Sequence, residues 1–326
     1  MACQQTPNTA MEQHAHPLPP PHQTGYCLSP MRDPDPITTA IATRLSALHS
    51  SQQLSAWSMI VTFMGDAIGP RGGVVSAAAL QGLMQHLGIG AGAVRTAVSR
   101  LSAEGWIERS REGRNSFYQL SGAVGETVRA AERRIYAASS LLPVDTQRCL
   151  VITPGPLPDK VLHALEAEGV LQIAPQVMLV FTRLDALPAD LIPTGATLAE
   201  APVIVAGTSM CTQIATVRQA AEIESLRQAY LPVAAALKQV PAPSPEDAMA
   251  LRCLMIHEWR RLALRVQSIP ADLIQPDDPE PATRALIAQI YAQLLPASEA
   301  WLDDNAATPS GPLPPADDRL ASRFGR

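Results

Sequence analysis

The fold of this chain follows from one stretch, which reads GAGAVRTAVSRLSAEGW over residues 90–106 and IERSREGRNSFYQL over residues 107–120. Its first part carries apolar residues at the spacing of one helix face: Val94, Ala97, Val98 and Leu101. The second part has two β-prone ends, residues 106–107 and 117–120, which flank a basic turn at 111–115. The stretch therefore predicts a short helix, ended by a glycine, and then a β-hairpin.

The opposite face of that helix is polar. At 100° per residue, Thr96 and Ser99 lie at its centre, and Arg95 and Arg100 lie on its two flanks. Guanidinium groups placed there reach base edges, or the phosphates that line a groove of DNA. An ordinary solvated helix face is the alternative interpretation of this pattern.

The predicted hairpin is basic at its tip. Arg109, Arg111 and Arg114 are placed to contact phosphates or to reach into a minor groove, and Asn115 lies in the same turn. The alternative is a flexible hairpin whose arginines are only solvated.

The residues before this stretch complete a recognisable order of elements. A weak helical pattern covers residues 37–49, and a stronger apolar stripe then predicts a helix packed on a core: Leu54, Trp57, Ile60, Val61 and Met64. Residues 74–75 fit one short strand. Ser76 is a suitable N-cap for a further helix over residues 77–86, and glycines mark a turn at 87–90. This order is typical of a winged helix-turn-helix DNA-binding domain, which we place at residues 37–122.

Charge is distributed unevenly along the chain. The formal net charge is −5, which argues against a protein that coats nucleic acid indiscriminately. Residues 37–122 hold seven arginines and four acidic residues, a net charge of +3, which leaves −8 for all other residues. The positive potential is therefore concentrated where the helix and the hairpin lie, and the expected partner is double-stranded DNA.

Length and composition exclude several other classes of protein. With 326 residues, of which 47% are hydrophobic, the chain is long enough for two or three domains with real cores. Its apolar runs are shorter than the roughly 18–20 residues of a membrane span, and its first residues do not resemble a secretory signal. We therefore expect a cytoplasmic protein that does not enter a membrane. The five cysteines are scattered without a Cys-x-x-Cys spacing, so they indicate neither a disulfide framework nor a zinc site.

The rest of the chain divides by composition and periodicity. Residues 1–36 are rich in Pro, His and Gln and are predicted to be a disordered tail, and residues 306–326 are predicted to be a loose tail. Between residue 122 and the second tail, we expect a connector helix over 123–145, a small α/β domain over 146–208 and a helical domain over 209–305.

Individual elements are also expected within these segments. The connector helix is placed at residues 126–142. Three apolar, β-rich segments and one helix predict the α/β domain, with strands at 150–152, within 171–181 and at 202–206, and a helix at 159–168. Helical periodicity predicts the C-terminal helices at 213–239, 245–267, 281–295 and 298–303.

Several sequence motifs resemble those of the PaaX family, whose members are repressors of phenylacetate degradation operons. In the first half they are AWSMIVTFMGD at residues 56–66, PRGG at 70–73, VRTAVSRL at 94–101, EGW at 104–106 and GRNSFY at 113–118. In the second half they are LMIHEWRRL at residues 254–262, IP at 269–270 and LIQP at 273–276. The resemblance spans roughly residues 50–305 in collinear order.

The resemblance implies an α+β chain with three parts. These are an N-terminal winged helix-turn-helix, a central domain similar to the small ferredoxin-like Cas2 fold, and a helical C-terminal domain. It also implies a homodimer that binds an imperfect palindromic operator and leaves DNA when an aryl-CoA thioester binds, such as phenylacetyl-CoA or a related acyl-CoA. No other cofactor is expected.

An effector of this kind carries phosphates, which guanidinium groups bind well. The candidates for effector binding are His257, Arg260, Arg261 and Arg265. The structural alternative is an ordinary i, i+3 ion pair between Glu258 and Arg261 beside a core tryptophan.

Two other functions are less consistent with the sequence. Cas2-like folds can carry metal-dependent nuclease chemistry, and Asp145 and Asp185 are the carboxylates nearest the predicted strands, but no phosphate loop or metal-binding motif accompanies them. We therefore expect neither an enzyme nor a metal site. A winged helix can also dock another protein without binding specific DNA, and this interaction module is the second hypothesis.

Overall fold

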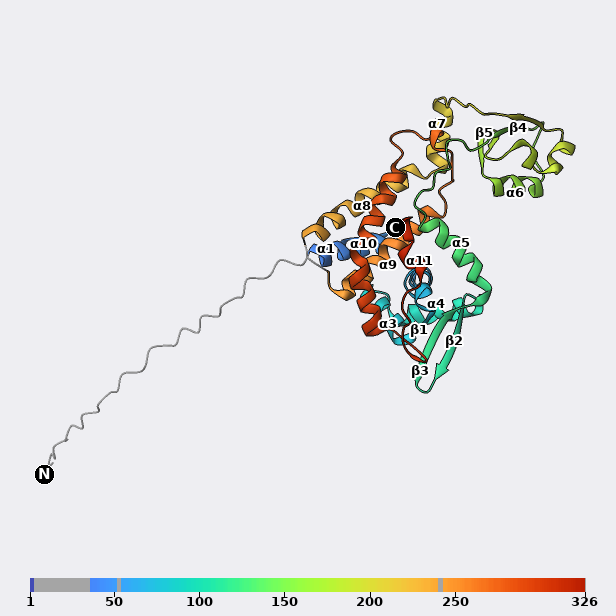
Figure 1. Cartoon of the computed structure of the whole chain (residues 1–326). Coiled ribbons are helices and arrows are strands. Elements are labelled where there is room, and N and C mark those ends of the chain that lie inside the picture. Colours follow the sequence, from blue (N-terminus) through green and yellow to red (C-terminus); the bar gives the residue numbers. More distant parts are fainter. Residues whose placement is uncertain (3–35, 52–53, 240–242, 326) are drawn as a thin grey trace. The chain divides into compact units, whose positions relative to one another are not determined.

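Helices alternate with antiparallel sheets in the computed structural model, which describes residues 1–2, 36–51, 54–239 and 243–325. The fold is therefore mixed, as the α+β expectation required. The tail predicted over residues 1–36 lies outside the described residues except at its two ends. From Pro36 onward, the described residues belong to one compact unit (Figure 1).

The first part of this unit contains four α-helices and a three-stranded sheet. In chain order the elements are α1 (Pro36–Ser50), α2 (Ala56–Phe63), β1 (Val74–Ser76), α3 (Ala77–His86), α4 (Ala91–Ala103), β2 (Ile107–Glu112) and β3 (Asn115–Leu120). The chain continues from α2 through a π-helical turn at Met64–Ile68. The strand order is β1-β3-β2, with all neighbours antiparallel.

Local signals placed α3 and α4 correctly. The Ser76 hydroxyl accepts a hydrogen bond from the Ala79 amide at 3.3 Å, so the predicted N-cap is confirmed. Gly105 follows α4 with a φ of +72°, a left-handed conformation that glycine adopts readily at the end of a helix.

The hairpin is longer than predicted. Glu112 pairs with Asn115, so the turn contains only Gly113 and Arg114, and the predicted loop over residues 111–115 is too wide. A two-residue turn needs positive φ, and Gly113 supplies it at +57°. The arginines of the hairpin therefore stand on paired strands, apart from Arg114 in the turn.

The C-terminal helices are α7 (Thr208–Val217), α8 (Ala220–Gln239), α9 (Pro245–Ala263) and α10 (Pro279–Asn305). The single helix predicted over 213–239 is divided at Gln219, which has a φ of +57°. The two helices predicted over 281–295 and 298–303 are one, although Pro296 lies inside it. Leu294 and Leu302 are fully buried on either side of the proline, and their packing holds the helix together across it.

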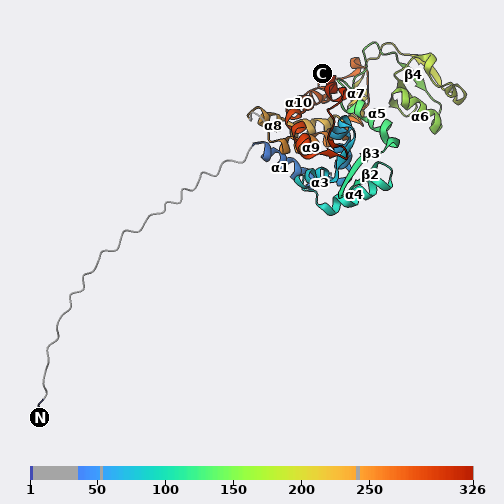
Figure 2. The same cartoon turned by 60° about the horizontal axis from the view of Figure 1, so that its bottom comes forward.

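Helix α9 is the centre of the largest hydrophobic core. Every side chain from Ala248 to Trp259 is buried, which is typical of a helix surrounded by protein. It packs against α1, α2, α3, α5 (Gly125–Ile135), α8 and α10 (Figures 1 and 2). Helices α1 to α4 and helices α8 to α10 thus share one core. The boundaries predicted between the domains stay a prediction, because a shared core does not show which segments fold alone.

A second, four-stranded sheet lies between α5 and α7 in the sequence. It contains β4 (Cys149–Ile152), β5 (Val170–Ala174), β6 (Val177–Val180) and β7 (Thr197–Glu200) in the antiparallel order β5-β6-β4-β7, with α6 (Asp159–Glu168) after β4. The helix predicted at residues 159–168 is confirmed. The strand predicted at 202–206 is wrong. Pro202 has no amide hydrogen to donate to a ladder, and the last strand of the sheet ends at Glu200.

The tail expected to be loose beyond residue 306 is ordered over residues 306–325, which corrects that prediction. It forms the small hairpin β8 (Ala307–Thr308) and β9 (Gly311–Pro312) and the short helix α11 (Asp318–Ala321). The Asp317 amide donates to the Pro70 carbonyl at 2.9 Å, and the Phe324 amide donates to the Tyr136 carbonyl at 2.7 Å. We call residues 306–325 the C-terminal strap. Its order comes from tertiary contacts rather than from its composition, which is rich in Pro, Gly and Asp.

Candidate nucleic-acid interface and anion pocket

Helix α4 exposes the residues that were predicted to read DNA. Its four apolar positions are buried in the core, and its other side is open to solvent at Arg95, Thr96, Ser99 and Arg100. The Thr96 hydroxyl donates to the Gly92 carbonyl at 3.1 Å, so part of its hydrogen-bonding capacity is used within the helix. In the described part of the chain, Arg95 has no hydrogen-bond or ion-pair partner.

Arg100 is held in place, unlike Arg95. Its Nε lies 2.7 Å from Glu104 Oε1, and Trp57 donates from its indole Nε1 to Glu104 Oε2 at 3.1 Å. The hydrogen bond from Arg100 lowers the pKa of Glu104 from its ordinary value. Trp57 in turn meets Trp106 edge-to-face, with ring centroids 5.4 Å apart. Arg100 is therefore connected through side chains to the base of the hairpin.

The hairpin exposes all four of its predicted contact residues. Arg109 donates from Nη2 to Ser116 Oγ at 2.9 Å, across the two strands. Arg111, Arg114 and Asn115 are exposed, and none of the described residues forms an ion pair with either arginine. Arg109 and Arg111 are two residues apart on β2, so they share one face of the strand.

The four effector candidates lie in different surroundings. His257 is 1% exposed inside α9, with Nδ1 3.5 Å from Ser58 Oγ. Arg260 donates to the Thr62 hydroxyl at 2.8 Å and to the Ser58 carbonyl at 3.2 Å, so it contacts α2. Arg261 and Arg265, in contrast, line the same pocket. The structure thus brings together two of the four candidates.

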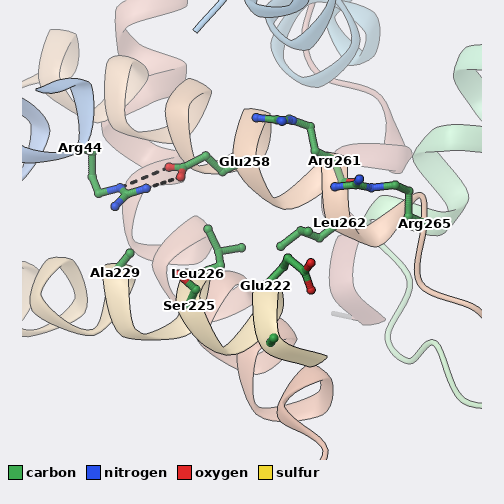
Figure 3. A pocket seen from close by; sticks show the side chains of 10 residues that line it. Arg44, Glu222, Ser225, Leu226, Ala229, Glu258, Arg261, Leu262 and Arg265 are labelled. Atoms are coloured by element: carbon green, nitrogen blue, oxygen red, sulfur yellow. Dashed lines mark hydrogen bonds and ion pairs between the residues drawn. The ribbon is translucent and has the colours of Figure 1, made fainter. Parts of the chain in front are cut away.

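This pocket has a volume of about 420 Å³ and lies between α1, α8 and α9. Figure 3 shows Arg261 and Arg265 extending from the end of α9, with Glu222 on α8. Arg265 donates from Nε to the Arg261 carbonyl at 2.8 Å. Three arginines and two glutamates line the cavity, and the unequal number leaves a positive charge for an anionic group. We call it the anion pocket.

Arg44 is a charged pocket residue that was not predicted from the sequence. It forms an ion pair with Glu258, 214 residues away, and Tyr230 donates its hydroxyl to the same carboxylate at 2.6 Å. Burial lowers the pKa of Arg44, but the charge of Glu258 outweighs it and leaves the pKa raised. One signal was present, because Arg44 is the only Lys, Arg, Asp or Glu in residues 37–49.

A second buried ionic group lies at Asp66. This carboxylate is 3% exposed and accepts hydrogen bonds from Arg252 Nε at 2.7 Å, Arg323 Nη1 at 2.8 Å and two tyrosine hydroxyls, those of Tyr136 and Tyr291. Burial raises the pKa of Asp66, but the charges of Arg252 and Arg323 outweigh burial and lower it. The group joins the turn after α2 to α9, α10 and the C-terminal strap. With its oxygens all engaged, Asp66 has a structural role.

Asp145 and Asp185, the two carboxylates named for nuclease chemistry, both lie at the surface. Asp185 forms a local ion pair with Arg183 at 2.5 Å on the surface, and Asp145 lies in an exposed turn before β4. Within the described residues, no three His, Cys, Asp or Glu side chains are placed to hold a metal ion.

Comparison with known proteins gives matches to two segments of the chain. The family model described as PaaX-like protein matches residues 55–124, and the model described as PaaX-like protein C-terminal domain matches residues 216–304. Over these two segments, the chain is similar to the PaaX family. The PaaX-like matches contain α2 to β3 and α8 to α10, while the four-stranded sheet and the C-terminal strap lie outside them.

Two individual proteins are also similar to this chain. The transcriptional repressor PaaX of Escherichia coli (strain K12) is 28% identical over 295 residues, which cover 83% of this chain and 90% of that protein. Among solved structures, the uncharacterized protein Rv0674 from Mycobacterium tuberculosis is similar with a TM-score of 0.45 and 15% identity, over 76% of this chain and 98% of that one. None of the described helices is long and apolar enough to cross a membrane.

Proposed function

We propose that this chain is a transcriptional repressor that binds double-stranded DNA, as the name of its Escherichia coli relative suggests. One observation carries the proposal: within residues matched by the PaaX-like model, α4 exposes a polar face bearing Arg95 and Arg100 beside a basic hairpin. A role as a regulator also fits the charge distribution, since the net +3 of residues 37–122 accompanies an acidic remainder.

We propose that residues 37–122 form a winged helix-turn-helix domain, and the mode of DNA binding follows from this fold. Helices α2, α3 and α4 and the sheet β1-β3-β2 have the order of such a domain. Helix α4 then enters the major groove, where Arg95, Thr96, Ser99 and Arg100 meet base edges and phosphates. Arg109, Arg111, Arg114 and Asn115 on the hairpin contact the adjacent backbone.

We further propose a cytoplasmic homodimer on an imperfect palindrome. A two-fold dimer places its two recognition helices about 34 Å apart, one turn of the duplex. The central sheet supports a ferredoxin-like (Cas2-like) domain, because β5-β6-β4-β7 is the strand order of a β-α-β-β-α-β unit read from one edge. In this chain, short 3₁₀ turns at Leu184–Ala186 and Ala189–Thr194 replace the second helix.

The regulated genes and the effector are proposed from the family resemblance together with the anion pocket. We propose an operon for an aromatic acid such as phenylacetate, with phenylacetyl-CoA or a related acyl-CoA as the effector. Arg44, Arg261 and Arg265 are placed to bind its phosphates, since guanidinium groups form paired hydrogen bonds with phosphate oxygens. Effector binding then favours a form of the dimer whose helices no longer match the operator spacing.

A titration of the full chain tests DNA binding. The probes are the duplex upstream of its own gene and a shuffled duplex of equal length and composition. We expect the first to bind about a thousandfold more tightly at the same salt concentration, the lower end for specific DNA-binding proteins. Equal, weak affinity for both duplexes would contradict the repressor proposal and favour a winged-helix module that docks another protein.

The effector is tested separately on the same complex. We expect saturating phenylacetyl-CoA to release the protein from the upstream duplex, whereas free coenzyme A, which shares the phosphates but lacks the acyl group, leaves more of the complex intact. Retention of DNA at saturating phenylacetyl-CoA would remove this effector and leave the DNA-binding proposal standing.

A further inference from the structure

A separate cavity of about 180 Å³ lies between α2, α5 and α9. It shares no lining residue with the anion pocket. Its walls are mainly apolar, with side chains from all three helices: Val61, Val128, Ala131, Ile135, Ile256 and Leu264. Trp106, at the base of the hairpin, also lines it.

Arg260 brings a positive charge to this apolar wall. Its Nε and Nη2 donate to uncharged groups, the Thr62 hydroxyl at 2.8 Å and the Ser58 hydroxyl at 2.5 Å. Its Nη1 has no hydrogen-bond partner among the described residues, and that atom is not sealed from the surroundings. Burial lowers the pKa of Arg260, but an arginine stays charged at neutral pH.

The acidic residues of the cavity do not neutralise Arg260. Asp66 and Glu132 both line the space, but each is bound to other arginines. Asp66 pairs with Arg252 and Arg323, and Glu132 pairs with Arg319 and Arg323. A half-buried guanidinium without a carboxylate partner in an apolar wall is unfavourable, and an anion in the cavity would relieve this cost.

We propose that this cavity binds a small monocarboxylic acid with an apolar body. The carboxylate accepts hydrogen bonds from Arg260, and the apolar body lies among Val61, Val128 and Ile256. A dry apolar cavity of about 150 Å³ holds benzene, so 180 Å³ is enough for an acid of six or seven carbons. A coenzyme thioester is far too large, which makes this ligand distinct from the effector proposed for the anion pocket.

The position of the cavity connects its ligand to the DNA-facing side. Trp106 meets Trp57 at a centroid distance of 5.4 Å, and Trp57 donates to Glu104, which holds Arg100. A ligand that displaces the Trp106 ring therefore changes the surroundings of Arg100. The same ring gives an optical signal of occupancy, because indole fluorescence depends on its surroundings.

Isothermal titration of the full chain without DNA tests the site. The probes are two acids, hexanoate and benzoate, and their uncharged counterparts, hexanamide and benzamide. We expect the acids to bind about tenfold more tightly than the amides, because only the acids carry a negative charge and form an ion pair with Arg260. Equal affinity of each acid and its amide, or no binding of any probe, would overturn the proposal.

Two variants of α5 locate the binding. Ala131→Leu fills the cavity, whereas Ala130→Leu places the same side chain on the exposed side of the same helix. We expect the first to weaken hexanoate binding more than tenfold and the second to leave it unchanged. Loss in both variants, or in neither, would contradict binding in this cavity, and a thermal melt of each verifies that it is folded.

Two variants of α9 identify the charge that matters. Arg260→Gln should abolish the difference between hexanoate and hexanamide, whereas Arg261→Gln, which faces the anion pocket, should retain it. A difference that survives in Arg260→Gln assigns the carboxylate to another residue and overturns the role of Arg260. Should Arg260→Gln fail to fold, the Ala131→Leu and Ala130→Leu pair still decides the site.

Discussion

At the scale of single residues, the two arginines of α4 differ in how freely they can move. Arg95 has no partner in the described chain, whereas Arg100 is bound to Glu104, which also holds Trp57. A side chain already held in one geometry loses less conformational entropy when it binds, but Arg100 must share its guanidinium with Glu104. Arg95 has no carboxylate that competes for its guanidinium, but it loses more conformational entropy when it binds DNA.

We expect Arg95→Ala to weaken specific DNA binding by about 1–3 kcal/mol, the range for the loss of one base contact. Fluorescence anisotropy with the operator and a shuffled duplex measures the change. Arg129→Ala is the matched control, since it removes the same charge from the exposed side of α5. Unchanged operator affinity in Arg95→Ala would exclude this residue from base recognition.

The ionisation of Asp66 makes the free energy of unfolding depend on pH. Its folded pKa lies below the ordinary value of 3.8, mainly because the charges of Arg252 and Arg323 outweigh burial. Its contribution to the free energy of unfolding is therefore complete above about pH 4 and is lost as the pH falls through the folded pKa.

We expect Asp66→Asn to lower the free energy of unfolding by about 3–5 kcal/mol at pH 7, because it leaves buried arginines without their counter-charge. Urea unfolding from pH 7 to pH 2 measures this, and the difference between variant and wild type should shrink at the acidic end. Asp303→Asn, whose side chain is 61% exposed, should cost less than about 1 kcal/mol. Equal losses in the two variants would contradict the role of burial.

At the scale of elements, the hairpin β2–β3 and the C-terminal strap differ in regular structure and in the burial of their arginines. The hairpin is paired along its whole length but exposes its arginines, so its charges are available to a partner. The strap has little regular structure, yet Arg323 within it is 2% exposed and bound to Asp66. Tertiary contacts can therefore order a segment that contains little helix or strand.

For the hairpin, we expect Arg111→Ala and Arg114→Ala to weaken binding to all DNA sequences alike. Each lost phosphate contact should reduce the slope of log affinity against log salt by about 1. Titrations at four salt concentrations with two duplexes give both quantities. A wild-type slope in the double variant would show that the hairpin does not contact phosphates.

For the strap, we expect Arg323→Gln to destabilise the protein by several kcal/mol, since it removes one buried counter-charge from Asp66. The nearby Arg319→Gln, at 44% exposure, should cost less than about 1 kcal/mol. Thermal unfolding of the two variants compares them directly. A strap that merely rests on the surface would give equal, small effects.

At the scale of the whole molecule, α9 links the parts that are proposed to bind different ligands. Its buried side chains belong to the same core as α2 and α4, and its C-terminal end carries Arg261 beside the anion pocket. A displacement of α9 therefore cannot leave the packing of the first helices unchanged, because close-packed cores transmit strain. This arrangement gives the proposed effector a physical route to DNA binding.

Coupling between two ligands is reciprocal, which gives a test that does not depend on the route. If phenylacetyl-CoA weakens operator binding by a given factor, operator DNA must weaken phenylacetyl-CoA binding by the same factor. Titrations of each ligand with and without the other provide the two numbers. In Arg261→Ala, we expect weaker phenylacetyl-CoA binding and unchanged operator affinity without effector; retained ligand affinity would remove Arg261 from the pocket.

The sequence by itself determined the elements whose signals are local. Ser76 caps α3, Gly105 ends α4 and the apolar spacing of α4 sets its buried face, because capping and periodicity act within one or two turns of chain. The exposed arginines of α4 follow from that same spacing. Local signals also misled, as at residues 202–206, where β-propensity does not say whether a partner strand is present.

Only the tertiary structure decided which distant residues meet. Arg44 joins Glu258 across 214 residues, and Arg323 in a tail without apolar periodicity reaches the buried Asp66. The sequence grouped His257, Arg260, Arg261 and Arg265 as neighbours, but successive residues on a helix point about 100° apart. Packing against different helices therefore places Arg260 and Arg261 in separate cavities, and that separation depends on the position of α9 in the core.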